Sequence, residues 1–143
     1  ELARTVGPDA IQLHGEWTPD EIGFVRAETE AKVLLTVDAD EPARAASFDG
    51  VADALVVDST DESGAGGTGE THDWTATGEL ATRLTTPVVL AGGLTPENVA
   101  AAVQTAEPFA VDVSSGVELT PGRKDHNAVA RFVANAGREV AIV

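Results

Sequence analysis

The chain has 143 residues and no cysteine, and its 24 acidic residues against 9 basic ones give a formal net charge of −15. This length fits one domain with its own core, over residues 1–143. The charge argues against nucleic-acid and anionic-membrane partners, which need a basic face, and the lack of cysteine excludes disulfides and thiolate metal sites. Since no apolar run approaches the roughly 20 residues that cross a bilayer, we expect a soluble, cytoplasmic protein.

The acidic residues are accompanied by very few lysines, namely Lys32 and Lys124. A solvated acidic surface is a more ordinary interpretation of this composition than an acidic patch for a partner. The same composition suits a halophilic protein in a high-salt cytoplasm, because dissolved ions screen the repulsion between like charges.

Short apolar runs alternate with helical patterns along the chain. The strand at 10–13 precedes a helix for which Thr18, Pro19 and Glu21 predict a capping box and a proline in the first turn. The predicted strands are 10–13, 32–37, 52–58, 86–93 and 109–113. The predicted helices are 18–28, 41–48, 73–84, 95–103 and 125–136.

Continuous apolar strands separated by helices predict a parallel α/β sheet that is buried on both faces. Two architectures fit this pattern, a doubly wound open sheet and a (β/α)8 barrel of the TIM type. A complete barrel needs eight units and about 250 residues. Five units in this chain would therefore form an incomplete barrel.

Polar or small residues stand where the predicted strands end, which is the edge that binds ligands in both architectures. They are His14, Asp58, Gly92, Gly93, Asp112, Ser114, Ser115 and Gly116. The glycines and serines after the last two strands offer backbone amides that can bind a phosphate. The alternative is that these glycines only supply the dihedral angles of tight turns.

Asp58 ends an apolar strand and precedes a long loop that contains Gly66, Gly67 and Gly69. A half-desolvated carboxyl group in this position can donate a proton near neutral pH, although capping of nearby loop amides is the more ordinary role. The loop is long enough to close over a site, and its glycines fit neither a Walker motif nor the dinucleotide fingerprint. The three histidines lack metal-ligand spacing, so no metal site is expected.

Four segments resemble one family, phosphoribosylanthranilate isomerase, in order and at compatible spacings. They are "IQLHGE", "VVDS…GGTGETHDW", "VVLAGGLTPENV" and "VDVSSGVELTPGRKD". The resemblance extends from about Asp9 to Val133. It implies a (β/α)8 barrel enzyme of tryptophan biosynthesis that converts N-(5-phosphoribosyl)anthranilate to 1-(2-carboxyphenylamino)-1-deoxyribulose 5-phosphate by an Amadori rearrangement, without a cofactor.

The resemblance also implies residue roles. Asp58 would be the general acid that protonates the furanose ring oxygen, and a base would then remove the proton from C2. His14 and Asp112 would line the pocket for the ribose or the anthranilate. The phosphate would bind to the loops of Gly92 and Gly93 and of Ser114, Ser115 and Gly116. Gly66, Gly67 and Gly69 would belong to the closing loop.

This sequence departs from the family at its first strands. The family's general base is a cysteine on the first strand, and its anthranilate-binding arginine follows the second, but the strand at 10–13 matches the family's fourth. We therefore expect residues 1–7 to end the third helix, the isolated chain to be poorly active or inactive, and its open sheet edges to favour self-association. The alternatives are a sugar-phosphate epimerase, an indole-glycerol-phosphate synthase, and a non-catalytic phosphate-binding half-barrel.

Overall fold

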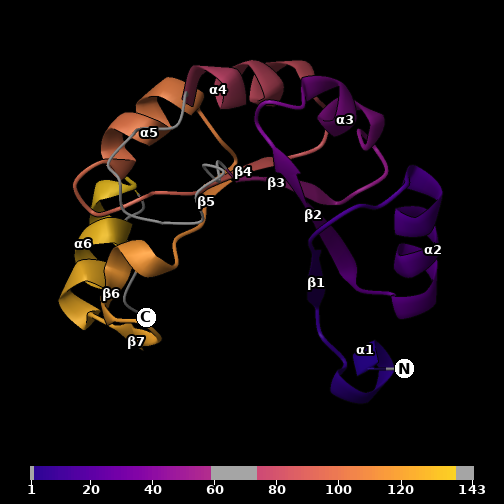
Figure 1. The fold of residues 1–143 in the computed structure, drawn as a ribbon, viewed down its shortest axis with the longest axis horizontal. Helices are drawn as coiled ribbons and strands as arrows, with labels where there is room; N and C mark the ends of the chain where they lie inside the picture. The colour runs from indigo at the N-terminus through magenta and orange to yellow at the C-terminus, as the bar shows by residue number, and fades with distance from the viewer. Residues whose placement is uncertain (1, 59–73, 138–143) are drawn as a thin grey trace.

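The computed structural model describes residues 2–58 and 74–137 (Figure 1). In this part of the chain, five strands form one parallel sheet in the order β1-β2-β3-β4-β5. The strands are β1 (Ala10–Leu13), β2 (Lys32–Asp38), β3 (Ala54–Asp58), β4 (Val88–Ala91) and β5 (Ala110–Val111). Every strand therefore lies beside the one that precedes it in the sequence.

The helices follow the strands in alternation. They are α1 (Leu2–Val6), α2 (Pro19–Thr29), α3 (Pro42–Ser47), α4 (Trp74–Arg83), α5 (Val99–Ala106) and α6 (His126–Asn135). In Figure 1 helices α2 to α6 lie along the outer side of the curved sheet, and the strands lie on the inner side. A doubly wound sheet would carry helices on both faces and a reversal of strand order, so the fold is of the barrel type and is open.

Local sequence signals account for the helix starts. At α2 the Glu21 N–H donates to Thr18 Oγ1 (3.3 Å) and the Thr18 N–H donates to Glu21 Oε2 (2.8 Å), so the predicted capping box is confirmed. Asp125 caps α6 through a single bond, in which its side chain accepts from the Asn127 N–H at 2.9 Å.

The hydrophobic core lies between the sheet and the outer helices. Alternate residues of β2 and β3 are buried there against α2 and α3, namely Val33, Leu35, Val37, Leu55 and Val57. A second cluster joins β4 to α5 and α6 through Leu90, Val99, Ala102 and Phe132. The residues between these positions on the strands face the inner side, where Gln12 Nε2 donates to Thr36 Oγ1 at 3.1 Å.

The helix predicted from residue 95 begins only at Val99. Residues 95–98 form a turn that leads into the helix, in which the Val99 N–H donates to the Thr95 carbonyl at 3.1 Å. Asn98 supports this turn, because its Oδ1 accepts from the Thr95 N–H (2.8 Å) and its Nδ2 donates to the Gly93 carbonyl (3.0 Å).

The last strand of the sheet is shorter than predicted, and further structure follows it. A 3₁₀ turn, η1 (Ser115–Val117), leads into an antiparallel hairpin of β6 (Glu118–Thr120) and β7 (Arg123–Lys124). The sequence pattern predicted no strand between 113 and 125. In the described part of the chain, no helix is long and apolar enough to cross a membrane.

Candidate active site

The parallel strands bring several of the predicted site residues to one edge of the sheet. Asp58 is the last residue of β3, and in the strand register it lies beside Asp38 on one side and Ala91 on the other. His14 follows directly after β1. Because parallel strands all end at the same edge, residues that are far apart in sequence become neighbours here.

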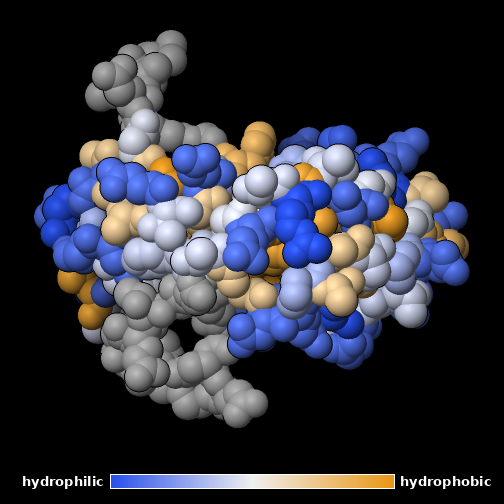
Figure 2. Space-filling model, turned by 90° about the horizontal axis from the view of Figure 1, so that it is seen from above, coloured by the Kyte–Doolittle hydropathy of each residue, from blue (hydrophilic) through white to orange (hydrophobic). Residues whose placement is uncertain are grey.

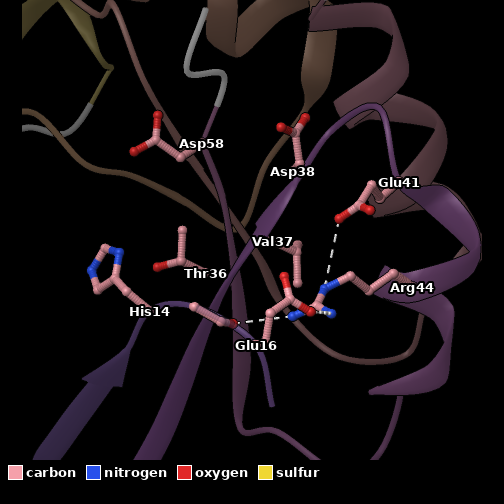
Figure 3. Close-up of a pocket in the computed structure, with 9 residues that line it drawn as sticks. His14, Glu16, Thr36, Val37, Asp38, Glu41, Arg44 and Asp58 are labelled. Atoms are coloured by element: carbon pink, nitrogen blue, oxygen red, sulfur yellow. Dashed lines mark hydrogen bonds and ion pairs between the residues drawn. The ribbon is translucent and has the colours of Figure 1, made fainter. Parts of the chain in front are cut away.

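A cavity of about 330 Å³ opens at this edge (Figure 3). It is lined by His14, Gly15, Glu16, Thr36, Val37, Asp38, Glu41, Arg44 and Asp58. Two predicted site residues, His14 and Asp58, therefore share one cavity. The lining also contains four carboxylates, which more than offset the positive charge of Arg44. They are those of Glu16, Asp38, Glu41 and Asp58.

Arg44 ties the loop after β1 to helix α3. Its Nη1 donates to Glu16 Oε2 at 2.6 Å and its Nη2 donates to the Gly15 carbonyl at 3.1 Å. The guanidinium also lies over the ring of Phe48, 5.7 Å from the centroid, and the side chain is only 22% exposed. A planar cation held on three sides gives this loop a defined position.

Trp17 holds the same loop from the other side. Its Nε1–H donates to the His14 carbonyl at 3.0 Å, while its ring packs on the core under α2. Trp17 thus combines core packing with a hydrogen bond to the loop. The backbone of His14 is fixed between Trp17 and the Arg44 contact with the next residue.

The two predicted phosphate loops lie against each other. Gly92 and Gly93 have positive φ angles of 84° and 60°, which glycine adopts without strain. Gly116 packs so closely on the loop after β4 that a Cβ added to it would overlap the carbonyl oxygen of Leu94. Glycine therefore suits the backbone geometry at these positions, and the loop after β5 contacts the loop after β4 where Gly116 meets Leu94.

The loop after β4 adjoins Asp58, but neither this loop nor the loop after β5 lines the cavity of Asp58. Gly92 follows Ala91, which lies beside Asp58 in the sheet register. Asp112 follows β5, is exposed, and donates its backbone N–H to the Leu90 carbonyl at 2.9 Å. Neither Asp112 nor the glycine and serine loops line the cavity that His14 and Asp58 share. Gly66, Gly67 and Gly69 lie outside the described residues.

Sequence reasoning missed several residues of this cavity. Asp38 ends a strand at the same edge as Asp58, so the rule that located Asp58 also points to it. Arg44 gave no such signal because it lies inside α3 and reaches the edge only through tertiary packing. Among the described residues, no group of three or more histidine or acidic side chains is arranged to hold a metal ion.

Comparison with known proteins identifies the family. A family model described as N-(5'phosphoribosyl)anthranilate (PRA) isomerase matches residues 1–135. The chain is 79% identical over 142 residues to an N-(5'-phosphoribosyl)anthranilate isomerase of Halorubrum lacusprofundi, covering 99% of this chain and 66% of that protein. It thus spans just under two thirds of the length of this relative.

Solved structures agree with the sequence matches. A phosphoribosyl anthranilate isomerase from Thermotoga maritima superposes with a TM-score of 0.80 at 39% identity, covering 95% of this chain and 65% of that one. Another, in complex with reduced 1-(o-carboxyphenylamino)-1-deoxyribulose 5-phosphate, has a TM-score of 0.75 at 36% identity, with 95% and 63% covered. The chain therefore belongs to the N-(5'-phosphoribosyl)anthranilate isomerase family.

Proposed function

We propose that this chain supplies the proton donor and the phosphate-binding loops of an isomerase in tryptophan biosynthesis. The substrate is N-(5-phosphoribosyl)anthranilate, and the product is 1-(2-carboxyphenylamino)-1-deoxyribulose 5-phosphate. The solved relative that holds a reduced form of this product supports the choice of ligand. The reaction moves protons within one molecule, so the proposed chemistry uses no cofactor.

The observation that carries this proposal is the placement of Asp58. It ends the central strand β3, shares a cavity with His14, and adjoins the glycine turn after β4. In the proposed reaction Asp58 protonates the furanose ring oxygen, the ring opens to a Schiff base, and loss of the C2 proton gives an enolamine. The enolamine tautomerises to the product ketone. A proton donor at the ring oxygen must be within hydrogen-bond reach of it.

The phosphate is proposed to bind the backbone amides around Gly93 and Ser115. Both residues are exposed, and the contact of Gly116 with Leu94 brings the two loops together. Backbone amides bind phosphate without a lysine. His14 and Asp112 are proposed to contact the ribose or the anthranilate from the first and last strands of the sheet.

The base has no counterpart in this sequence, since the family resemblance implies a cysteine and the 143 residues contain none. A positioned base contributes roughly 10²–10⁴-fold to a rate. We therefore expect the isolated chain to turn the substrate over poorly. The proposal also includes a cytoplasmic location, and self-association through the outer edges of β1 and β5, each of which pairs on one side only in the described sheet.

The test compares the chain alone with a fusion. The fusion joins this chain to the third of the Halorubrum lacusprofundi relative that it does not match, in the order that the relative has them. We expect the fusion, and not the isolated chain, to show substantial turnover in an anthranilate fluorescence assay. Asp58→Asn in the fusion should lower kcat by about 10²–10⁴-fold, because it removes the proton donor.

Two controls separate the role of Asp58 from a general loss of structure. Asp9→Asn makes the same chemical change at the opposite edge of the sheet, before β1, and should leave turnover unchanged. The reduced product named above should still bind to the Asp58→Asn fusion, as measured by calorimetry. A kcat within threefold of the parent fusion would show that Asp58 is not the acid.

A further inference from the structure

We propose that Lys124 is a positioning residue of the phosphate site. Its ammonium group holds the carbonyl of Ser114, and this fixes the direction in which the amides of Ser115 and Gly116 point. The inference rests on the proposed function, because it takes these amides to be the phosphate ligands. Lys124 itself acts through the backbone and does not need to touch the phosphate.

The contacts of Lys124 join two parts of the loop that follows β5. Its Nζ donates to the Ser114 carbonyl at 2.8 Å and to Glu118 Oε1, also at 2.8 Å. Lys124 lies on β7 directly opposite Glu118 on β6, so the hairpin itself sets the position of the ammonium group. The hairpin thereby acts as a frame from which Lys124 reaches back to the start of η1.

The Ser114 carbonyl depends on this lysine more than on its own turn. The 3₁₀ turn supplies only a long bond, from the Val117 N–H to the Ser114 carbonyl at 3.5 Å. The bond from Lys124 is 0.7 Å shorter and carries a charge, and charge-assisted bonds are the stronger class. Loss of the ammonium group would leave this carbonyl with its weaker donor.

Glu118 keeps the lysine in place. The carboxylate is only 15% exposed and also accepts from the Gly122 N–H at 3.2 Å. The bonds from Lys124 and from Gly122 lower the pKa of Glu118, so it stays ionised at neutral pH. The ion pair is thus built into the hairpin, which distinguishes it from an exposed pair between mobile side chains.

Other contacts hold the rest of the loop after β5, so the loss of Lys124 would loosen only the start of η1. The Asp125 N–H donates to the Val117 carbonyl at 2.8 Å, and Gly116 packs on Leu94. These anchors act on the end and the middle of η1, whereas Lys124 acts on its beginning. We therefore expect loss of Lys124 to disturb the amides of Ser115 and Gly116 while the domain stays folded.

The Lys124–Glu118 ion pair also affects the charge around the proposed phosphate loop. With a net charge of −15, this protein repels anions, and Lys124 neutralises a carboxylate close to the proposed phosphate loop. Removal of Lys124 alone would expose the charge of Glu118, whereas removal of both groups would not. A double-mutant cycle therefore separates the positioning of the carbonyl from the exposed charge.

The experiment titrates inorganic phosphate into the ¹⁵N-labelled fusion described above at fixed KCl concentration and follows its amide resonances. We expect Lys124→Met to weaken phosphate binding about tenfold and to shift the Ser115 and Gly116 resonances of the free protein. Lys124→Arg should restore most of the affinity. Lys124→Met combined with Glu118→Gln should bind better than Lys124→Met alone, yet more weakly than wild type.

Lys32→Met is the matched control. It removes the chain's other lysine, which lies at the opposite edge of the sheet and pairs with Asp53, so phosphate affinity should not change. If wild type binds phosphate and Lys124→Met binds it equally well, the positioning role is wrong and the proposed site survives. If wild type does not bind phosphate at these amides, the proposed phosphate site itself is wrong.

Glu118→Gln tests the positioning role of Lys124 even if Lys124→Met folds poorly. This variant keeps the ammonium group but replaces its ion pair with a weaker neutral hydrogen bond, so a positioning role predicts weaker phosphate binding. If Lys124 only attracted the phosphate by its charge, Glu118→Gln should tighten phosphate binding, because the variant removes the nearby negative charge of Glu118. Unchanged or tighter binding in Glu118→Gln would overturn the inference.

Discussion

Gly116 shows how a single residue shapes the site. It lies where the loop after β5 crosses the loop after β4, and its backbone leaves no space for a side chain beside the Leu94 carbonyl. A backbone oxygen cannot move aside as the end of a flexible side chain can. The absence of a Cβ at this position therefore allows the two proposed phosphate loops to meet.

Gly116→Ala should consequently destabilise the protein and weaken phosphate binding. Forcing one extra methyl group into a packed contact costs about 1–3 kcal/mol, which denaturation in urea would measure. Gly23→Ala is the control, because a Cβ there meets nothing within 4 Å, and alanine is the better helix former inside α2. A Gly116→Ala protein as stable as wild type would show that the loops separate at little cost.

At the scale of elements, Asp53 connects α2, β2 and β3. It precedes β3, accepts from the Val33 N–H of β2 at 2.9 Å, and pairs with Arg26 of α2 at 2.9 Å and with Lys32 at 3.3 Å. Its side chain is 11% exposed. Burial acts to raise the pKa of Asp53, but the Val33 N–H and the two cations outweigh it, so the pKa is lower than usual.

Asp53→Asn should lower the free energy of unfolding by about 2 kcal/mol at neutral pH, since it weakens hydrogen bonds that involve charged groups. A lowered pKa in the folded state stabilises the protein above the unfolded value of about 3.9 and is lost as pH falls through the folded value. The difference between wild type and variant should therefore be constant from pH 7 to 5 and shrink below about pH 4.

Urea denaturation at several pH values measures this difference. Glu79→Gln, an exposed acid on α4, is the control and should change stability little at any pH. A difference that stays constant down to the lowest pH would mean that the ionised form of Asp53 contributes nothing.

At the scale of the whole molecule, the dominant property is the charge of −15 that results from 24 acidic and 9 basic residues. Hydrophilic residues lie over much of the face that Figure 2 shows. Among the described residues, the pairs Arg4–Glu28 and Arg131–Glu97 are exposed on both sides, and such pairs contribute little. Repulsion among the remaining carboxylates therefore opposes folding at low salt. Screening shortens its range from about 10 Å at 0.1 M salt to about 3 Å at 1 M.

The Tm should accordingly rise between 0.1 M and 2 M KCl at pH 7, by about 4 °C for each kcal/mol of repulsion removed. Circular dichroism melting curves would record this rise. The same salt series near pH 4 should give a smaller increase, because part of the carboxylates are then protonated. Equal increases at both pH values would indicate that salt acts through water structure and not through charge.

Secondary structure was largely predictable from local signals. The strand at 10–13 has the predicted bounds, and the Thr18 capping box is present because both of its partners lie within four residues. The predicted start of α5 was too early, because residues 95–98 form a turn before the regular helix begins at Val99. The hairpin after η1 was missed because its strands are too short to show alternation.

The sequence by itself determined the alternation of strands and helices, the family, and the residues that stand at strand ends, since these depend on neighbours along the chain. Only the tertiary structure decided that Arg44 reaches the cavity from α3 and that Gly116 meets Leu94. Hydrophobic periodicity reports which face of an element is buried, but it does not report which element covers that face. Contacts between distant segments are set by packing, and packing exists only once the chain has folded.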